Sequence, residues 1–174
     1  WFEFASQEEF NMEFKSTQKI EGDTLILNFE GAIDEDATFP AVEPDKYAKM
    51  VLDLNGISAI NSVGIREWME WIKPIAAKLS IRLKNCPKAM VFQFNMVEGF
   101  LPQGSVVESF YVPFYCEKCD KEENALFVVG KDIVVEGGTP KVKFDPKSQL
   151  KCTNADCELE MDVTEAKYFQ FLTR

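Results

Sequence analysis

The sequence contains no histidine among its 174 residues. Serine–histidine and cysteine–histidine nucleophile pairs are therefore excluded, because both need an imidazole as the general base. Proton transfer would fall to Asp, Glu, Lys, Tyr or Cys side chains. The sequence also lacks a glycine-rich phosphate-binding loop and a convergent set of catalytic groups, so we expect a protein that is not an enzyme.

Long apolar runs are also missing. No stretch approaches the roughly 20 consecutive apolar residues that span a bilayer, and nothing at the N-terminus resembles a cleavable signal. We therefore expect a cytoplasmic protein without a membrane partner. The chain begins with Trp1 instead of Met, and we expect it to be a piece of a longer or processed protein.

Positive charge is scarce. The chain carries 19 Lys and Arg residues against 29 Asp and Glu residues, which gives a formal net charge of −10. Contacts with nucleic acid phosphates need a basic surface, and docking on anionic lipid needs one as well. The composition therefore predicts partners that are neither nucleic acids nor membranes.

The sequence does contain the apolar fraction of a soluble globular protein, 46%, and enough residues for one ordinary domain and a small second module. In the first part of the chain, short β-type runs alternate with segments of helical spacing. The predicted strands are a first strand around Met12, Phe14 and Ser16, then 24–29, 50–54, 80–83 and 106–114, and the predicted helices are 62–79 and 88–97. This alternation predicts an α/β fold whose sheet is covered mainly on one side.

The most informative segment is KMVLDLNGISAINSVGI, residues 49–65. Apolar residues dominate 50–54, as in a strand covered on both faces, and helical spacing begins after a polar turn. Ser62 stands where the helix starts, beside unpaired backbone N–H groups and the positive end of the helix dipole. Ser62 therefore either caps the helix or carries a phosphate group.

Four of the five cysteines form two closely spaced pairs, Cys116-x-x-Cys119 and Cys152-x4-Cys157. Four thiolates brought together in this way fit tetrahedral Zn²⁺, and a site without an open position would be structural. Two alternatives stay open, a pair of disulfides and a redox-active Cys116/Cys119 pair. Cys86 stands apart and is interpreted as a buried apolar residue.

Between and after the cysteine pairs, the sequence predicts a small β-rich module. The runs 125–129 and 132–135 flank a turn signal at Gly130 and predict a hairpin. Residues 142–144 predict a further strand, and the tail 163–172 has helical spacing. Such a module is too small to hold a core alone, so metal binding would supply much of its folding free energy.

These observations divide the chain into three parts. They are an N-terminal aromatic segment (1–11), an α/β domain (12–114), and a zinc-ribbon-like module with a C-terminal helix (115–174).

Three stretches of the α/β domain together resemble a STAS domain, the module named for sulfate transporters and anti-sigma factor antagonists. Residues 27–34, LNFEGAID, are similar to the family's strand that ends in a Gly-x-Leu-Asp turn. Residues 50–64 are similar to its central strand and the serine-containing turn that follows, here NSVG at 61–64. Residues 85–91, NCPKAMV, are similar to its later strand, loop and helix, in which a proline opens the helix.

The resemblance implies a STAS-like mixed β-sheet with helices on one side, and a non-enzymatic module that binds proteins in bacterial signalling. In the antagonist branch of the family, a kinase-like anti-sigma factor phosphorylates the turn serine, and phosphorylation switches the choice of partner. The matching serine is Ser62, which is the candidate phosphorylation site. The candidate partner-binding residues are Asp34, Asn61, Ser62, Val63 and Gly64.

Two other functions remain open from the sequence. One is a constitutive scaffold without phosphorylation, which docks partners on the acidic segment 30–45 and on the zinc module. The other is the binding of a small anionic ligand, such as a nucleotide, at the Ser62 turn. Nucleic acid binding by the zinc module is disfavoured by the few basic residues around Cys152 and Cys157.

Overall fold

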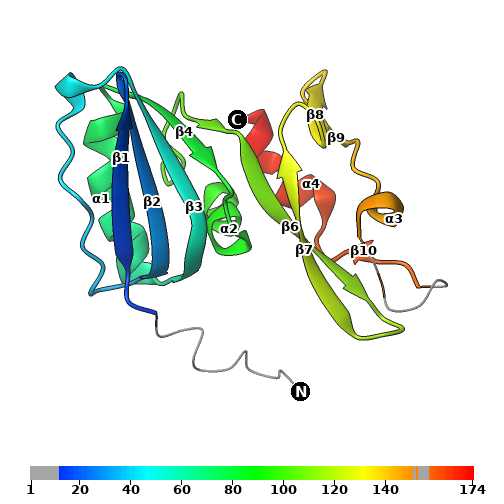
Figure 1. Cartoon of the computed structure of the whole chain (residues 1–174). Coiled ribbons are helices and arrows are strands. Elements are labelled where there is room, and N and C mark those ends of the chain that lie inside the picture. Colours follow the sequence, from blue (N-terminus) through cyan, green and yellow to red (C-terminus); the bar gives the residue numbers. More distant parts are fainter. Residues whose placement is uncertain (1–11, 151, 153–156) are drawn as a thin grey trace.

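The computed structural model describes residues 12–150, 152 and 157–174 and has a mixed α/β fold (Figure 1). The predicted aromatic segment 1–11 lies outside the described residues. The strands of the main sheet are β1 (Lys15–Glu21), β2 (Thr24–Ile33), β3 (Lys49–Ile60), β4 (Ser80–Lys84) and β5 (Val106–Val107). The helical elements beside them are η2 (Pro44–Lys46), α1 (Ser62–Ala76) and α2 (Lys88–Met96). The predicted fold class, α/β with a mixed sheet, is confirmed.

The main sheet has the strand order β1-β2-β3-β4-β5. Strand β1 is antiparallel to β2, and the other neighbouring strands are parallel. Crossovers between parallel strands are right-handed, and those after β3 and β4 move across the sheet in the same direction. Helices α1 and α2 therefore lie on the same face of the sheet.

The two faces of the main sheet differ in polarity. Leu27 of β2 is paired with Leu52 of β3, and both are fully buried. Val51 and Asp53 point to the other face and are half-buried. The prediction that 50–54 is covered on both faces is therefore wrong, because helices on a single side leave the opposite face open to solvent.

Aromatic side chains fix α1 to its surroundings. The indole of Trp68 is fully buried and donates its N–H to the carbonyl oxygen of Phe100 at 2.9 Å. The indole of Trp71 donates to the carbonyl oxygen of Pro40 at 2.8 Å and stacks on Phe39, with ring centroids 4.9 Å apart. The segment that joins β2 to β3 is thereby held against α1.

The second part of the chain forms two smaller sheets, in the orders β10-β6-β7 and β8-β9. Their strands are β6 (Ser109–Cys116), β7 (Lys121–Val128), β8 (Ile133–Glu136), β9 (Thr139–Val142) and β10 (Glu160–Met161). The remaining helical elements are α3 (Pro146–Gln149), α4 (Glu165–Tyr168) and η3 (Gln170–Thr173). In the part of the chain that the structure describes, no helix is both long enough and apolar enough to cross a membrane.

The hairpin predicted across Gly130 is wrong. Strand β7 pairs with β6 along its whole length, and β8 pairs with β9 through a turn at Gly137 and Gly138. Gly130 does turn the chain, but the carboxylate of Asp132 accepts the backbone N–H of Val128 at 2.9 Å. This bond closes a local loop instead of starting a ladder between β7 and β8.

Several predicted boundaries shift as well. Helix α1 ends at Ala76 instead of residue 79, and the predicted helix 163–172 is divided between α4 and η3. The predicted strand 142–144 overlaps β9 only at Val142. These ends depend on tertiary contacts that periodicity does not record.

The two parts of the chain share one hydrophobic core. Strand β6 begins beside β4, where Cys86 and Phe110 form an isolated parallel bridge. Buried residues from β2 through η3 belong to a single cluster. The division at residues 114 and 115 stays a prediction, and this boundary falls within β6.

The close contact between Gly64 of α1 and Ile33 of β2 can be tested by mutation. A Cβ atom at this position would lie 1.9 Å from the carbonyl oxygen of Ile33. Gly64→Ala is therefore expected to lower the free energy of unfolding by about 3 kcal/mol, measured by chemical denaturation. Ser62→Ala, at an exposed position of the same turn, should change it by less than about 0.5 kcal/mol. Equal stability of the two variants would contradict the close packing.

Candidate functional site

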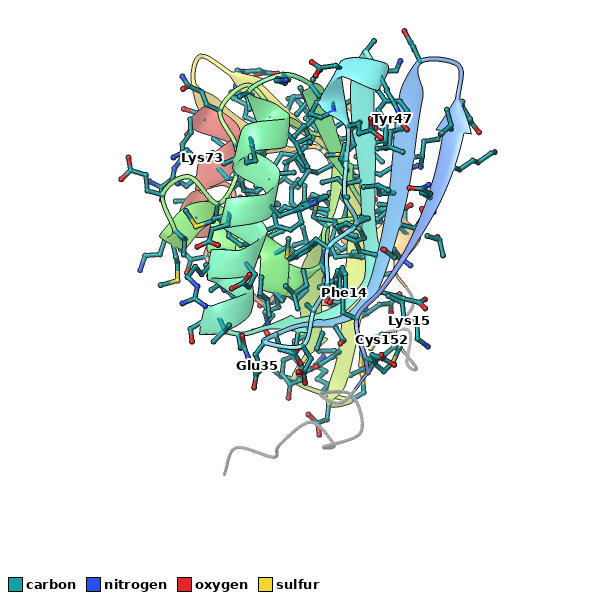
Figure 2. All side chains as sticks on the ribbon, turned by 90° about the vertical axis from the view of Figure 1, so that its left-hand side faces the viewer. Phe14, Lys15, Glu35, Tyr47, Lys73 and Cys152 are labelled. Atoms are coloured by element: carbon teal, nitrogen blue, oxygen red, sulfur yellow. The ribbon has the colours of Figure 1, made fainter. Side chains whose placement is uncertain are left out.

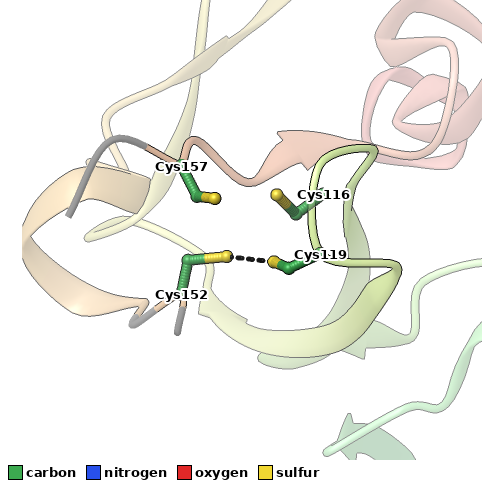
Figure 3. Close-up of side chains that lie close together, drawn as sticks. All are labelled: Cys116, Cys119, Cys152 and Cys157. Atoms are coloured by element: carbon green, nitrogen blue, oxygen red, sulfur yellow. Dashed lines mark hydrogen bonds between the residues drawn. The ribbon is translucent and has the colours of Figure 1, made fainter. Parts of the chain in front are cut away.

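Four cysteines from distant parts of the chain meet at one end of the β6–β7 hairpin (Figure 3). Cys116 is the last residue of β6, and Cys119 lies in the turn before β7. Cys152 follows α3, and Cys157 precedes β10. Because β10 pairs antiparallel with β6, the chain after Cys157 returns to the hairpin.

The geometry of the four sulfur atoms fits a metal ion. They lie within 4.8 Å of one another, and the Sγ atoms of Cys119 and Cys152 are 2.7 Å apart. Tetrahedral coordination at the roughly 2.3 Å typical of zinc–thiolate bonds would place sulfur atoms about 3.8 Å apart. This separation lies between the 2.7 Å of Cys119 and Cys152 and the 4.8 Å within which all four sulfur atoms lie. All five cysteines are free, so the alternative of two disulfides is not seen. The prediction that these four cysteines come together is confirmed.

The turn that carries Cys119 is closed by a residue that sequence reasoning missed. Asp120 has a positive φ of 51°, a conformation that Asp tolerates better than most residues. Its carboxylate accepts a hydrogen bond from the Tyr115 hydroxyl at 2.8 Å. An Asp directly after the second cysteine of the pair was the available signal for this tight turn.

The electrostatics of the cluster favour a bound cation. Burial raises the pKa of the Cys157 thiol, and hydrogen bonds with Cys116 and Cys119 raise it further. Four thiols this close repel one another when ionised, so a cation is needed to keep all of them as thiolates. Lys121 also lies nearby, and its pKa is raised first by a hydrogen bond to Glu123 and then by the charges of the cysteines.

The second candidate site lies at the carboxyl ends of β2 and β3. Ile33 is paired with Ile60, and the backbone N–H of Asn61 donates to the carbonyl oxygen of Ile33 at 3.2 Å. Asp34 and the turn 61–64 are thereby side by side. Ser62 is exposed, and its hydroxyl has no hydrogen-bond partner among the residues that the structure describes.

The residue that caps α1 is Asn61. Its Oδ1 accepts the backbone N–H of Gly64 at 2.8 Å, and its own backbone is extended. The alternative that Ser62 is only the cap is therefore wrong, because Ser62 is already the first residue of the helix. Asn is among the preferred cap residues, so the sequence did carry this signal.

Glu35 completes this site and was not singled out from the sequence. Its Oε2 accepts a hydrogen bond from the Asn61 side-chain amide at 2.8 Å. A hydrogen bond from its own backbone, and then the bond from Asn61, lower the pKa of the Glu35 carboxyl. In Figure 2, Glu35 lies at the end of the molecule where α1 begins, and Lys73 lies toward the other end of the helix. A carboxylate here is favoured by the helix dipole.

A polar network on the open face of the sheet is structural. Asn85, with a positive φ of 53°, donates from its side chain to both carboxylate oxygens of Asp53 at 3.0 Å. Its backbone N–H donates to the hydroxyl of Ser109 at 2.8 Å. The network joins β3, the end of β4 and β6. Cys86, the next residue, is fully buried, in agreement with its interpretation as an apolar core residue.

No protein-family model matches this chain, and no curated protein matches it. The cysteine cluster and the Ser62 turn are therefore the two features of the molecule that point to a function.

The capping role of Asn61 can be tested directly. Asn61→Ala removes the acceptor for the Gly64 N–H and should lower the free energy of unfolding by about 1 kcal/mol. Asn61→Ser keeps a short acceptor and should recover most of this loss. The measurement is urea denaturation followed by circular dichroism, with Ser62→Ala as the neighbouring control. A larger loss in Ser62→Ala than in Asn61→Ala would contradict the assignment.

Proposed function

We propose that this chain is a non-enzymatic protein-interaction module in bacterial signalling, similar to the STAS domains of anti-sigma factor antagonists, and that phosphorylation of Ser62 switches its partner. The observation that carries the proposal is the exposed Ser62 hydroxyl. This hydroxyl does not cap α1, because the cap is the side chain of Asn61. The partner that this resemblance implies is an anti-sigma factor with serine kinase activity. Asp34, Asn61 and Val63 would form the surrounding contact surface, whereas Gly64 is buried against Ile33.

The architecture supports this proposal. The resemblance implies a mixed sheet with helices on one side, which agrees with the order of β1 to β5 and the position of α1 and α2. It also aligns a glycine turn with Gly31, whose φ is +89° and whose Cβ would lie 2.2 Å from the carbonyl oxygen of Glu13. Asp34 and Ser62 then lie at neighbouring strand ends, as two residues of one contact surface should.

A phosphate on Ser62 would act on binding and leave the fold intact. It adds about −1.5 to −2 charges and three acceptor oxygens at the amino end of α1, where helix N–H groups favour an anion. The Glu35 carboxylate, bound to the adjacent Asn61, would be repelled. The surface would change in charge and shape, while the buried residues of α1 would keep their contacts.

The same carboxylate weighs against the binding of a free nucleotide or other small anion at this turn. Glu35 already places a negative charge at the start of α1, with its pKa lowered. A free anion would have to overcome this repulsion with its own binding energy. A covalently attached phosphate does not, because the kinase reaction supplies the energy of attachment.

We further propose that Cys116, Cys119, Cys152 and Cys157 bind one structural Zn²⁺ ion in a zinc-ribbon-like module. Four thiolate ligands satisfy tetrahedral Zn²⁺ and leave no position for substrate. The ion would join the β6–β7 turn to the two chain segments around α3 and β10. Its binding free energy would then contribute to folding.

The switch is tested by measuring the affinity of the anti-sigma factor for three variants by calorimetry. Ser62→Ala should bind as the wild type does, and Ser62→Asp should bind at least about tenfold more weakly, or about 1.4 kcal/mol. Ser58→Asp changes an exposed serine on β3, the strand that precedes the Ser62 turn; it is the control for added charge and should bind normally. Equal affinity of all variants would leave a constitutive scaffold as the function.

Zinc binding is tested by elemental analysis of the purified protein. About one zinc per chain is expected, and Cys119→Ser should reduce the zinc content and the melting temperature. Cys86→Ala removes a buried cysteine outside the cluster, so it should retain the metal. A wild-type protein that contains no metal would refute the proposed site.

A further inference from the structure

The segment that begins at Cys157, here called the C-terminal segment (residues 157–174), returns from the cysteine cluster to the first part of the chain. Its strand β10 pairs with β6, and its helices α4 and η3 pack against α2. Tyr168, Phe169 and Phe171 are all buried. In Figure 1, this segment, coloured orange to red, runs from the lower end of the hairpin to the C-terminus near the main sheet.

Specific hydrogen bonds fasten the far end of this segment to α2. The guanidinium of Arg174 donates to the carbonyl oxygens of Phe94 at 3.0 Å and Asn95 at 2.8 Å. Helix α2 has no basic residue in its own last turn, so Arg174 supplies the positive charge that its carbonyl end favours. The side chain of Asn95 donates to the carbonyl oxygen of Tyr168 and accepts the N–H of Phe171, both at 2.8 Å.

Beneath the C-terminal segment lies the region around Phe110 and Cys86. The ring of Phe110 contacts those of Phe169 and Phe171, with centroids 5.9 and 5.2 Å apart. The Tyr168 hydroxyl donates to the carbonyl oxygen of Tyr111 at 2.6 Å, one residue beyond Phe110. Cys86, bridged to Phe110, is fully buried.

These contacts cannot form a stable unit by themselves. Helix α4 has four residues and η3 has four, and helices this short are not stable in water without tertiary contacts. A cross-link at Cys157 would hold the start of the segment beside β6 and so reduce the entropy lost when the rest docks. Metal binding and docking of the segment should therefore be coupled.

We propose that the four-cysteine centre is a metal-dependent clamp that holds the C-terminal segment over Phe110 and Cys86. With a thiophilic divalent cation bound, the segment stays docked and the apolar surface of α2 stays covered. Loss of the cation releases the segment and exposes Cys86, while the main sheet remains folded. This inference rests on the metal site proposed above. It adds a second surface, around Cys86 and Phe110, whose exposure depends on the bound cation and which does not involve Ser62.

The thiol of Cys86 is the natural reporter of release. The full chain, as purified, is treated with N-ethylmaleimide with and without a chelator, and each cysteine is read separately by peptide mass spectrometry. We expect chelation to accelerate labelling of Cys86 by about tenfold or more, because local opening controls the access of the reagent. Hydrogen exchange of β2 and β3 in the same samples should stay slow.

A second arm loosens the opposite end of the clamp without touching the metal ligands. Arg174→Ala should accelerate labelling of Cys86 in the metal-loaded protein, while the cluster cysteines stay protected. Arg66→Ala removes an arginine whose ion pair is with the neighbouring Glu67, and it should leave the labelling of Cys86 unchanged.

The outcomes separate the clamp from the metal site. If the metal is present and Cys86 stays protected after it is removed, the clamp is refuted and the metal site stands. If Cys86 becomes reactive only together with fast exchange in β2 and β3, global unfolding explains the result and the clamp is refuted as well. Absence of metal from the purified protein refutes both.

Discussion

The parallel pairing of β2 with β3 is the constraint on which the rest of the structure depends. It places Leu27 beside Leu52 in the core and continues to Ile33 and Ile60 at the carboxyl edge. The register shifts around Glu30, where Gly56 allows the strands to approach: a Cβ there would lie 2.5 Å from the Cβ of Glu30. The same pairing therefore builds the core under α1 and brings Asp34 beside the Ser62 turn.

A second set of contacts joins the cysteine cluster to the region of the main sheet and α2. Strand β6 begins beside the end of β4, where Phe110 is bridged to Cys86, and carries Cys116 at its far end, while the C-terminal segment brings the chain back to α2. Aromatic rings fill the space between these paths: Phe127 lies 4.7 Å from Phe144 and 6.1 Å from Phe169, between centroids. The small sheets thus share the core of the main sheet, which explains how a short β module folds without a core of its own.

The sequence was sufficient where local pattern and burial agree. The alternation of strands and helices predicted the α/β fold, and the spacing of the cysteine pairs predicted their meeting. It failed where two local pairings competed: β7 pairs with β6 across the turn 117–120, and the bond between Asp132 and the Val128 N–H closes a loop before β8. Asn61 caps α1 through a bond to the N–H of Gly64, three residues away, and the sequence carried that signal. The bond between Asn61 and Glu35 depends on the pairing of β2 with β3, which the local pattern does not contain.

The two candidate sites would affect different free energies, Ser62 that of binding and the four cysteines that of folding. Ser62 is exposed on a helix whose first turn is already capped and packed through Gly64 against Ile33, so a charge added there has little packing to disturb. The effect of such a charge would be confined to the exposed surface around Ser62. The cysteines, in contrast, join segments with few local contacts, so a cation bound to them would contribute directly to folding. If both proposals hold, the chain would change its partner without losing stability, and would release its C-terminal segment without changing the Ser62 surface.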